Sequence, residues 1–536
     1  MNIPLTPLRF LRYAEQQYPG RTAVVCNQHR FTYAEFADRT RRLAGALRQA
    51  GTHPGDRVAF LSVNCHRLLE AYYGVLEAGA VLLPLNFRLA AGELGYVLND
   101  AGASLLFVEQ QFLGQVESFR RDIPCVRMFC QLDGASEAPW LAPDNYEGLL
   151  AAATPHRAEI ASIDENALAE LFYTSGTSAN PKGVMLTHRN LYLHALHVCL
   201  AFQIENGAIE LHTIPLFHAN GWGFPQFGTM CGFKHVLLRR FDPPTIFRLI
   251  EEERVSYVIL VPTMAAALLS CPTRTQHDLS SLKYILLGGA ASSPQLIAQL
   301  EAFLPHTSIT VGYGMTETSP VVSTSRPKST NQFADDHQRL RFSASAGWPA
   351  HGGDIRVVDK QGHDVPQDDT TVGELVVRGD QVMDGYYRSP KLTREAIVDG
   401  WLHTGDMAVW SCEKFFRIVD RKKDIIISGG ENIASIEVEH ALLTHPGVLE
   451  CAVVAAPDPR WGEIPAAIVV IAADSCITEE QLLETARKHL GKFKLPRRFI
   501  IQTDPLPKGG TGKIQKNQLR TQFWTGPQPQ EKALTK

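Results

Sequence analysis

The sequence predicts a large α/β protein with more than one domain. Segments with the period of an amphipathic helix alternate with short apolar strands, which is the pattern of helices packed on a mostly parallel sheet. The chain has 536 residues, of which 45% are hydrophobic, and this is more than a single core normally holds. We therefore expect at least two domains, the first of them α/β.

The expected elements follow from local patterns in chain order. A helix is expected over 33–50, where apolar residues recur at helical spacing. Short runs rich in aliphatic and β-branched residues predict strands over 57–62, 104–108, 255–261, 284–287 and 308–311. The composition from Thr525 onward predicts a disordered tail, and no internal repeat is evident.

Charge and cysteine usage exclude some classes of protein. The net charge of −4 argues against a broadly basic nucleic-acid binder. Ten cysteines without a C-x-x-C pair, and no histidine cluster at metal-ligand spacing, favour reduced thiols and argue against structural zinc. The first residues lack the features of a signal peptide, and no apolar run reaches about 18 residues. We expect a cytoplasmic protein without a transmembrane segment.

Residues 173–183 read Tyr-Thr-Ser-Gly-Thr-Ser-Ala-Asn-Pro-Lys-Gly and favour a phosphate-binding loop. Gly176 and Gly183 let backbone N–H groups turn inward. Hydroxyl donors come from Thr174, Ser175, Thr177 and Ser178, and Lys182 adds a positive charge. The loop is not a Walker A motif, because Pro181 stands where the second glycine is required. A solvated loop is the alternative on local composition alone.

A second stretch, 311–320, follows the strand expected over 308–311. It brings an aromatic ring, a hydroxyl and a carboxylate to the C-terminal end of that strand, in Tyr313, Thr316 and Glu317. These groups suit adenine, phosphate and Mg²⁺, and Mg²⁺ needs few carboxylates when phosphate oxygens and water complete its shell. Taken alone, the stretch could also be a capped turn.

Further motifs occur downstream, and together they carry a family resemblance. They are Gly-Glu-Leu at 373–375, Tyr-Tyr at 386–387, Trp-Leu-His-Thr-Gly-Asp at 401–406, Asp-Arg-Lys-Lys-Asp at 420–424, Ser-Gly-Gly-Glu-Asn at 428–432 and Leu-Pro-Lys-Gly-Gly-Thr-Gly-Lys at 506–513. In this order and spacing the chain resembles the adenylate-forming superfamily of acyl-CoA synthetases, amino-acid adenylation domains and beetle luciferases. The resemblance covers nearly the whole chain.

The resemblance implies a two-step reaction and a two-domain architecture. A carboxylate attacks the α-phosphate of ATP to give an acyl-AMP and pyrophosphate, and a thiol, usually that of CoA, then displaces AMP. The implied fold is an N-terminal adenylation domain over 1–420, with two α/β subdomains and a small β-barrel portion. A hinge over 421–423 joins it to a mobile α/β domain over 424–524, and the tail spans 525–536.

The resemblance also implies roles for individual residues in the first step. The phosphate loop from Thr174 to Lys182 would hold pyrophosphate, Thr174 and Glu317 would share Mg²⁺, and Thr316 would bind the α-phosphate. The adenine slot would be formed by Gly289, Ala290, Gly312 and Tyr313. Asp406 and Arg421 would bind the ribose, and Lys513 would be the adenylation lysine. A lysine suits the last role because in-line attack builds negative charge around phosphorus.

The second step would use other residues of the C-terminal portion. Lys423 lies at the implied hinge, about which the small domain rotates to present a different face. Ser428, Gly429 and Gly430 would then line the pantetheine tunnel of CoA. An acyl carrier protein is the alternative thiol donor, and a homodimer is an open alternative for the assembly state.

The segment 215–223 points to the acyl substrate. It reads Pro-Leu-Phe-His-Ala-Asn-Gly-Trp-Gly and resembles the Phe-His-Val-Asn-Ala-Trp stretch of bacterial fatty acyl-CoA synthetases and plant peroxisomal acyl-activating enzymes. His218 would be a gate and catalytic residue, and it would line the acyl pocket together with Trp222 and Gly314. Because the segment has no carboxylate for an ammonium group, we expect an uncharged acid, namely a medium- or long-chain fatty acid, with an aryl acid as the alternative.

One position departs from the family pattern. Ala179 stands where the phosphate loop commonly has glycine. If that position needs a positive φ, the added Cβ costs on the order of 1 kcal/mol. We expect an active enzyme with weakened ATP handling.

Overall fold

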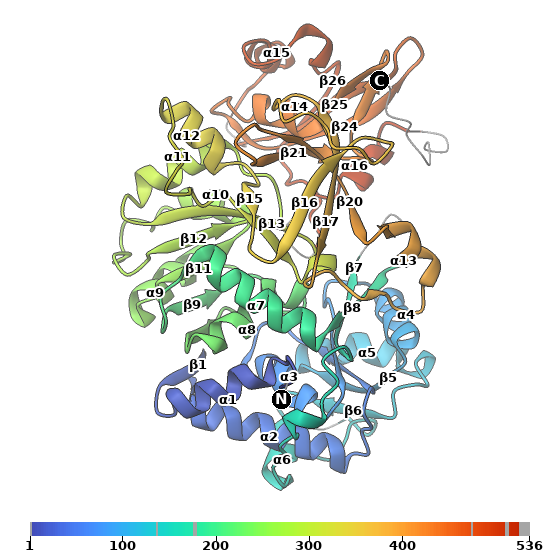
Figure 1. Cartoon of the computed structure of the whole chain (residues 1–536). Helices are drawn as coiled ribbons and strands as arrows, with labels where there is room; N and C mark the ends of the chain where they lie inside the picture. The colour runs from blue at the N-terminus through green and yellow to red at the C-terminus, as the bar shows by residue number, and fades with distance from the viewer. Residues whose placement is uncertain (1–2, 136–137, 175–179, 473–474, 510–513, 525–536) are drawn as a thin grey trace.

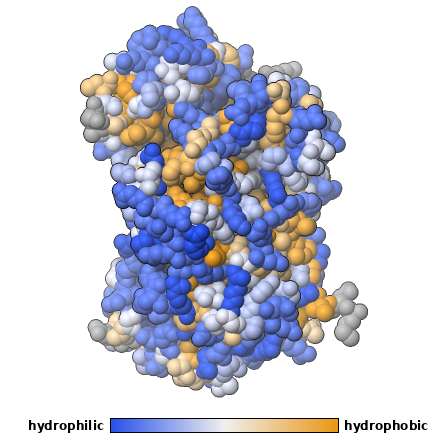
Figure 2. All heavy atoms as spheres, turned by 90° about the vertical axis from the view of Figure 1, so that its left-hand side faces the viewer, coloured by the Kyte–Doolittle hydropathy of each residue, from blue (hydrophilic) through white to orange (hydrophobic). Residues whose placement is uncertain are grey.

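The computed structural model describes residues 3–135, 138–174, 180–472, 475–509 and 514–524. Figure 1 shows the first helices at one end of the molecule and the C-terminal strands at the other. In the view of Figure 2, the side that lies on the left in Figure 1, the surface is mostly hydrophilic with scattered apolar patches. No helix within the described ranges is long and apolar enough to cross a membrane.

The first sheet is mainly parallel and ends in an antiparallel hairpin. Its strand order is β18-β8-β7-β4-β3-β5-β6, with bounds Gly385–Tyr386, Lys182–Thr187, Leu168–Thr174, Val81–Pro84, Arg57–Leu61, Ala103–Val108 and Met128–Gln131. Strands β7 and β8 pair antiparallel, with Thr174 opposite Lys182. The expected phosphate loop therefore connects two neighbouring strands of this sheet.

The second sheet carries the long parallel run of the fold. Its order is β15-β14-β13-β12-β11-β9-β10-β1-β2, with bounds Trp348–Pro349, Val321–Thr324, Ser308–Gly314, Tyr284–Leu287, Tyr257–Leu260, Ile209–His212, Lys234–Leu237, Thr22–Cys26 and His29–Thr32. Strands β13, β12, β11, β9, β10 and β1 are parallel. Their carboxyl ends meet at one edge, which is where open α/β sheets bind ligands.

Helices cover both faces of the second sheet. The helices of the first half of the chain are α1 (Leu8–Gln17), α2 (Tyr33–Gln49), α3 (His66–Glu77), α4 (Ala91–Ala101), α5 (Leu113–Phe119), α6 (Tyr146–Ala152), α7 (His188–Phe202), α8 (Phe224–Met230), α9 (Pro243–Glu253) and α10 (Pro262–Leu269). Of these, α4 and α5 pack on the first sheet. Along β11, Tyr257 and Ile259 pack with α7 and α8, whereas Val258 and Leu260 pack with α9 and α10. This alternation follows from the period of two along a strand.

Two smaller sheets follow, and their strands pair antiparallel except that β26 pairs parallel with β25. The first contains β16 (Gly353–Val358), β17 (Val372–Gly379), β20 (Trp401–Trp410), β19 (Ile397–Val398) and β21 (Phe416–Arg421). The C-terminal one contains β23 (Glu431–Ile433), β22 (Ile426–Ser428), β25 (Gly462–Ile471), β24 (Val448–Asp458) and β26 (Arg498–Gln502). The remaining helices are α11 (Pro294–Phe303), α12 (Asp336–Ser343), α13 (Pro390–Ala396), α14 (Ser435–Leu442), α15 (Glu479–Arg487) and α16 (Lys516–Thr521).

The α/β architecture with a large N-terminal and a small C-terminal portion is as expected, and the local predictions differ from it mainly at their ends. The predicted helix over 33–50 is α2, which begins after a capping box in which Thr32 accepts from Glu35 N at 3.2 Å and donates through its own backbone N–H to the Glu35 carboxylate at 2.7 Å. The strand predicted over 255–261 is shorter, Tyr257–Leu260, while the one predicted over 308–311 extends to Gly314. The predicted tail from Thr525 lies outside the described residues.

Candidate active site

The ends of β7 and β8 hold the described part of the expected phosphate loop. Register places Thr174 beside Lys182, and Gly183 allows a close approach, since a Cβ there would lie 3.1 Å from Tyr173 Cζ. The predicted residues Ser175, Gly176 and Thr177, together with Ala179, lie outside the described residues. Thr174 and Lys182 therefore mark the two ends of the loop.

A lysine, a tyrosine and a glutamate are joined beside this loop. The Lys182 ammonium lies 5.3 Å from the centroid of the Tyr386 ring, which is the distance of a cation–π contact. The Tyr386 hydroxyl donates to Glu317 Oε1 at 2.8 Å. Glu317 belongs to the 3₁₀ helix η5 (Thr316–Thr318), which follows β13, and both Thr316 and Glu317 are buried.

Burial dominates the electrostatics of Glu317. It raises the pKa of the Glu317 carboxyl, although the hydrogen bond from Tyr386 and the charges of Arg421 and Lys182 act in the opposite direction. A further cation bound nearby would therefore stabilise the ionised form of Glu317. One oriented carboxylate next to a phosphate loop fits the donor set that Mg²⁺ requires.

A second group of side chains, Tyr313, Asp406 and Arg421, links β13 of the second sheet to β20 and β21. Asp406 is buried and pairs in register with Arg421. Its Oδ1 lies 2.6 Å from Arg421 Nε, and its Oδ2 accepts from the Tyr313 hydroxyl at 2.6 Å. Burial, reinforced by Asp406, raises the pKa of Tyr313, so the phenol stays protonated and donates. A carboxylate has about four lone-pair sites, so Asp406 retains capacity for ribose hydroxyls.

Glycines shape the edge where β12 and β13 end. Gly289 has φ +74°, and a Cβ on Gly288 would lie 2.7 Å from Trp222 Cζ3 and 2.9 Å from the Gly312 carbonyl oxygen. Gly289 and the following Ala290 are exposed at this turn. The structure thus places the predicted acyl-pocket residue Trp222 directly against the predicted adenine turn. Gly314 also has no room for a side chain, because a Cβ there would lie 1.8 Å from the Pro320 carbonyl oxygen.

The expected acyl segment forms the 3₁₀ helix η4 (Ala219–Gly223). Trp222 is buried with φ +63° and belongs to an apolar cluster with Phe224, Val261 and Leu286. His218 is half-buried just before η4, and its backbone N–H donates to Pro215 O at 3.0 Å. The surroundings of Trp222 suit an apolar group.

The predicted hinge and tunnel residues lie at the start of the C-terminal sheet. The Lys423 carbonyl accepts from Arg520 at 3.3 Å, and Arg520 also forms a 2.7 Å ion pair with Asp424. Ser428 is buried at the end of β22, and Gly429 and Gly430 turn into β23 with φ of +59° and +90°. A Cβ on Gly429 would lie 2.5 Å from Trp461 Cε3. Glycine is therefore required at this turn.

The predicted adenylation lysine, Lys513, lies outside the described residues, but the residues on either side of its segment are described. Lys508 and Ile514 form an antiparallel bridge on either side of that segment. The Arg88 guanidinium donates to the Gly509 carbonyl at 3.3 Å. This contact joins the segment that leads to Lys513 to the N-terminal portion of the chain.

Two contact residues were missed by the sequence reasoning. Tyr386 was noted only as part of a motif, and its role depends on β18 pairing with β8, which brings it to Glu317 and Lys182. Arg88 follows β4 and contacts a residue 421 positions away. For Tyr386, the sequence offered only a tyrosine pair next to a glycine. For Arg88, no local sequence pattern indicates the contact.

The ends of an expected phosphate loop, a buried carboxylate beside them and an Asp–Arg–Tyr group at the carboxyl end of a parallel sheet form the arrangement expected of a nucleotide-binding enzyme. Comparison with known proteins narrows the class. The AMP-binding enzyme family model matches residues 11–387, and the model of the AMP-binding enzyme C-terminal domain matches residues 437–513. The chain belongs to the AMP-binding enzyme family.

Known proteins that are similar over nearly their whole length define the type of enzyme. The long-chain-fatty-acid–CoA ligase of Thermus thermophilus is 38% identical, covering 92% of this chain and 90% of its own. A feruloyl-CoA synthase of an Amycolatopsis species is 39% identical, covering 94% and 96% respectively. The ATP-bound structure of MatB from Rhodopseudomonas palustris has a TM-score of 0.84 at 27% identity, covering 96% and 99%. This chain is an acyl- or aryl-CoA ligase that acts through an acyl-AMP.

Proposed function

We propose that the enzyme activates a medium- or long-chain fatty acid with ATP and Mg²⁺ and transfers the acyl group from the acyl-AMP to CoA. The observation that carries the proposal is the apolar cluster around Trp222, which lies directly against the Gly288–Gly289 turn next to the nucleotide edge. An acid bound there would place its carboxylate toward the α-phosphate and its chain among apolar side chains.

The nucleotide would be held by the two groups described above. Asp406 and Arg421 would bind the ribose, Tyr313 with Gly289, Ala290 and Gly312 the adenine, and Thr316 the α-phosphate. Lys182 and the loop from Thr174 would hold pyrophosphate. Thr174 and Glu317 would hold Mg²⁺, which neutralises phosphate charge during the transfer. The buried, Tyr386-oriented carboxylate of Glu317 supports this assignment.

Chemistry would proceed by in-line attack of the substrate carboxylate on the α-phosphorus, with pyrophosphate leaving. Lys513 would stabilise the charge that builds on the phosphoryl oxygens. The thiol of CoA would then attack the acyl carbon, forming the thioester and releasing AMP. The contact of Arg88 with Gly509 supports access of the Lys513 segment to the N-terminal domain. Rotation about Lys423 would withdraw that segment and bring Ser428, Gly429 and Gly430 to the site, where His218 acts as a gate.

An aryl acid is the second candidate substrate. The ring of Trp222 packs closely on two glycines, since a Cβ on Gly288 or Gly289 would lie 2.7 or 3.1 Å from it, and an aryl substrate would stack well on such an aromatic side chain. The similarity to a feruloyl-CoA synthase favours the same reading. A carrier-protein phosphopantetheine remains the alternative acceptor, because it presents the same thiol as CoA.

The test is a panel of acids assayed with ATP, Mg²⁺ and free CoA, with AMP and thioester measured separately. A preference for medium- or long-chain fatty acids with acyl-CoA as product supports the proposal. A preference for aryl acids selects the second candidate. Formation of an acyl-AMP that free CoA does not consume would move the acceptor to a carrier protein.

A further inference from the structure

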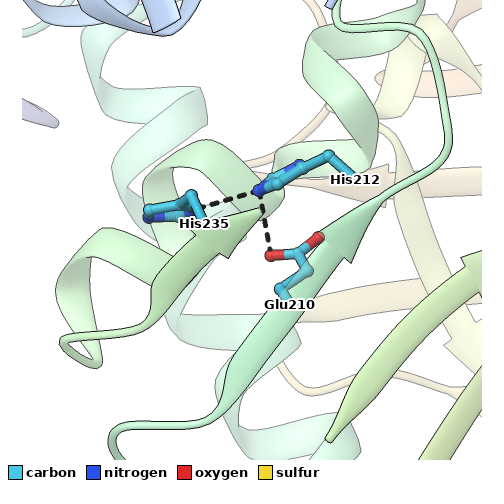
Figure 3. A group of neighbouring side chains, drawn as sticks. All are labelled: Glu210, His212 and His235. Atoms are coloured by element: carbon cyan, nitrogen blue, oxygen red, sulfur yellow. Dashed lines mark hydrogen bonds and ion pairs between the residues drawn. The ribbon is translucent and has the colours of Figure 1, made fainter. Parts of the chain in front are cut away.

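A group of three metal-binding side chains lies in the core of the large sheet. Glu210 and His212 belong to β9 and His235 belongs to β10, and all three are buried. The strands are parallel, with His235 opposite Glu210, and residues two apart on one strand share a face. Figure 3 shows the three side chains pointing toward one another from the two strands.

The distances between the donor atoms are close to those around a metal ion. Glu210 Oε2 lies 3.4 Å from His212 Nε2, and His212 Nε2 lies 2.8 Å from His235 Nδ1. One ligand atom from each residue lies within 4.8 Å of the others. Zn²⁺ bonds of about 2.0–2.1 Å place tetrahedral ligands about 3.4 Å apart, so the Glu210–His212 separation already fits and the His–His separation would have to widen by about 0.6 Å.

The carboxylate of Glu210 lacks the partners that a buried acid requires. Both of its oxygens are inaccessible to solvent and have no hydrogen-bond partner within the described structure, and the 3.4 Å contact with His212 is an ion pair only when that imidazole is protonated. The hydroxyl of Tyr257, which pairs in register with Glu210 from β11, is likewise buried without a partner. Burial raises the pKa of Glu210, and no lysine or arginine offsets this effect. A bound cation would satisfy these groups.

The neighbouring helix α8 orients His235 as metal sites require. His235 Nε2 lies 3.2 Å from the Thr229 hydroxyl. If Nε2–H donates to this hydroxyl, Nδ1 carries the lone pair and faces His212, which is the usual arrangement of a metal-binding histidine. Gly228 permits the approach, since a Cβ there would lie 2.7 Å from His235 Cε1 and 3.4 Å from Glu210 Oε2.

We propose that Glu210, His212 and His235 bind one Zn²⁺ ion at a structural site buried between β9, β10 and α8. Two imidazoles and a carboxylate are a common zinc ligand set, and water or the Tyr257 hydroxyl would complete it. Binding uses both histidines in the neutral form and the ionised Glu210, so a protonated Glu210 releases one proton on loading. The ion is enclosed and enters as the chain folds.

The site is separate from the nucleotide edge. Register aligns Glu210 with Tyr257, Tyr284 and Ser308, which is the first residue of β13, whereas Tyr313 is five residues further along that strand. Five residues of strand span about 17 Å. The ion would therefore link β9 to β10 beneath α8, the helix that follows the Trp222 segment.

The sequence argument against structural zinc did not consider this arrangement. It rested on cysteine pairs and on histidine spacing along the chain. His212 and His235 are 23 residues apart and are brought together only by strand pairing.

The test is metal analysis of the full-length protein, without any substrate, so that its outcome is independent of the proposed function. Protein expressed with ample zinc and purified in a chelating buffer should contain about one Zn²⁺ per chain. His235→Gln should lose at least tenfold in zinc content. His188→Gln is the matched control, because His188 is also buried and contacts Thr6, but lies away from the cluster; it should keep the metal.

A second measurement uses the wild-type chain alone, so it does not depend on the folding of a variant. Protein unfolded with chelator and refolded with Zn²⁺ should have a higher Tm than protein refolded without it, and refolding with Co²⁺ should give the visible absorption of tetrahedral cobalt. Wild-type protein free of metal, with a Tm that is insensitive to Zn²⁺ during refolding, would overturn the proposal and leave a protonated Glu210 beside a neutral histidine pair.

Discussion

Tyr386 donates a 2.8 Å hydrogen bond to Glu317 Oε1 while its ring lies under the Lys182 ammonium, 5.3 Å from the ring centroid. This one side chain connects the carboxylate proposed to bind Mg²⁺ with the cation proposed to bind pyrophosphate. It comes from β18, a two-residue strand that pairs with β8 at the edge of the first sheet. The relationship makes the proposed metal and phosphate sites dependent on each other.

Removing the Tyr386 hydroxyl should weaken the handling of Mg-ATP. Tyr386→Phe keeps the ring under Lys182 but removes a hydrogen bond to a charged group, which contributes about 1.5–3 kcal/mol. We expect kcat/KM for ATP to fall by roughly 10- to 100-fold, with a higher Mg²⁺ requirement. Steady-state kinetics across a Mg²⁺ titration measures this. Tyr387→Phe is the control, since the contact of its hydroxyl within the described residues is a 3.5 Å one with Ala101 O. Equal effects of both variants would argue against the role of Tyr386.

Activity should decline on the acid side through the titration of Glu317. Burial raises the pKa of this carboxyl above its ordinary value, and the ionised form is the one that binds a cation. As the pH falls through that pKa, Glu317 gains a proton and Mg-ATP binding is lost. The acid limb of log kcat/KM for ATP should therefore lie above the pH expected for an exposed glutamate. In Tyr386→Phe the limb should move to still higher pH, whereas an unmoved limb would assign it to another group.

Loss of the Asp406 charge should impair nucleotide binding. Asp406→Asn leaves the half-buried Arg421 without its counter-charge and removes an acceptor for the ribose and for Tyr313. Affinity for AMP, measured by calorimetry, should fall by roughly 10-fold or more, which corresponds to about 1.4 kcal/mol. Asp354→Asn is a suitable control in the same sheet, because its partner Arg378 is exposed. An unchanged AMP affinity in Asp406→Asn would remove Asp406 from the ribose site.

A methyl group on Gly288 should disturb the acyl and nucleotide sites together. It would stand 2.7 Å from the Trp222 ring and 2.9 Å from the Gly312 carbonyl, so one of them must move. Overpacking of this kind costs about 1–3 kcal/mol. We expect Gly288→Ala to raise the KM for the acid and lower kcat. Gly20→Ala, where the added Cβ meets nothing within 4 Å, should behave as wild type. A Gly288→Ala enzyme with wild-type kinetics would show that Trp222 does not border the acyl path.

Stiffening the hinge should separate the two half-reactions. Lys423→Pro fixes φ at that residue and restricts Lys422 before it. Thioester formation from supplied acyl-AMP should fall more than acyl-AMP formation, and single-turnover assays of each step can compare them. Lys423→Ala removes the side chain but keeps the backbone freedom, so it is the control. Equal loss of both steps in Lys423→Pro would contradict a hinge at this residue.

Much of the architecture could be predicted from the sequence, because local signals and tertiary packing agree. The helix over 33–50 has both an apolar period and a capping box at Thr32 and Glu35, and the strand over 284–287 was predicted with its observed bounds. The strand over 255–261 was predicted too long, because Val255 and Ser256 precede the paired segment although Val255 is buried. Burial alone therefore does not locate the end of a strand.

Contacts between distant segments could not be predicted in the same way. Asp406 and Arg421 were placed together at the ribose by family resemblance, but their register pairing across β20 and β21, with Tyr313 as the third member, needed the structure. The Tyr386–Glu317 bond and the Glu210, His212 and His235 group depend on which strands become neighbours. A short β18 strand and two histidines in separate strands leave no local pattern. The roles of all the predicted site residues stay predictions, and Ser175, Gly176, Thr177 and Lys513 also lie outside the described residues.

The central claim is that this chain joins a carboxylic acid to CoA through an acyl-AMP that Lys513 helps to form. The most direct measurement is a single-turnover assay of wild type and Lys513→Ala with ATP, Mg²⁺, CoA and a medium- or long-chain fatty acid. It would be run once from the free acid and once from synthetic acyl-AMP. We predict that wild type forms acyl-CoA in both cases, while Lys513→Ala fails from the free acid and succeeds from acyl-AMP. Formation of acyl-CoA from the free acid at equal rates in both proteins, or no thioester from acyl-AMP in wild type, would contradict the account.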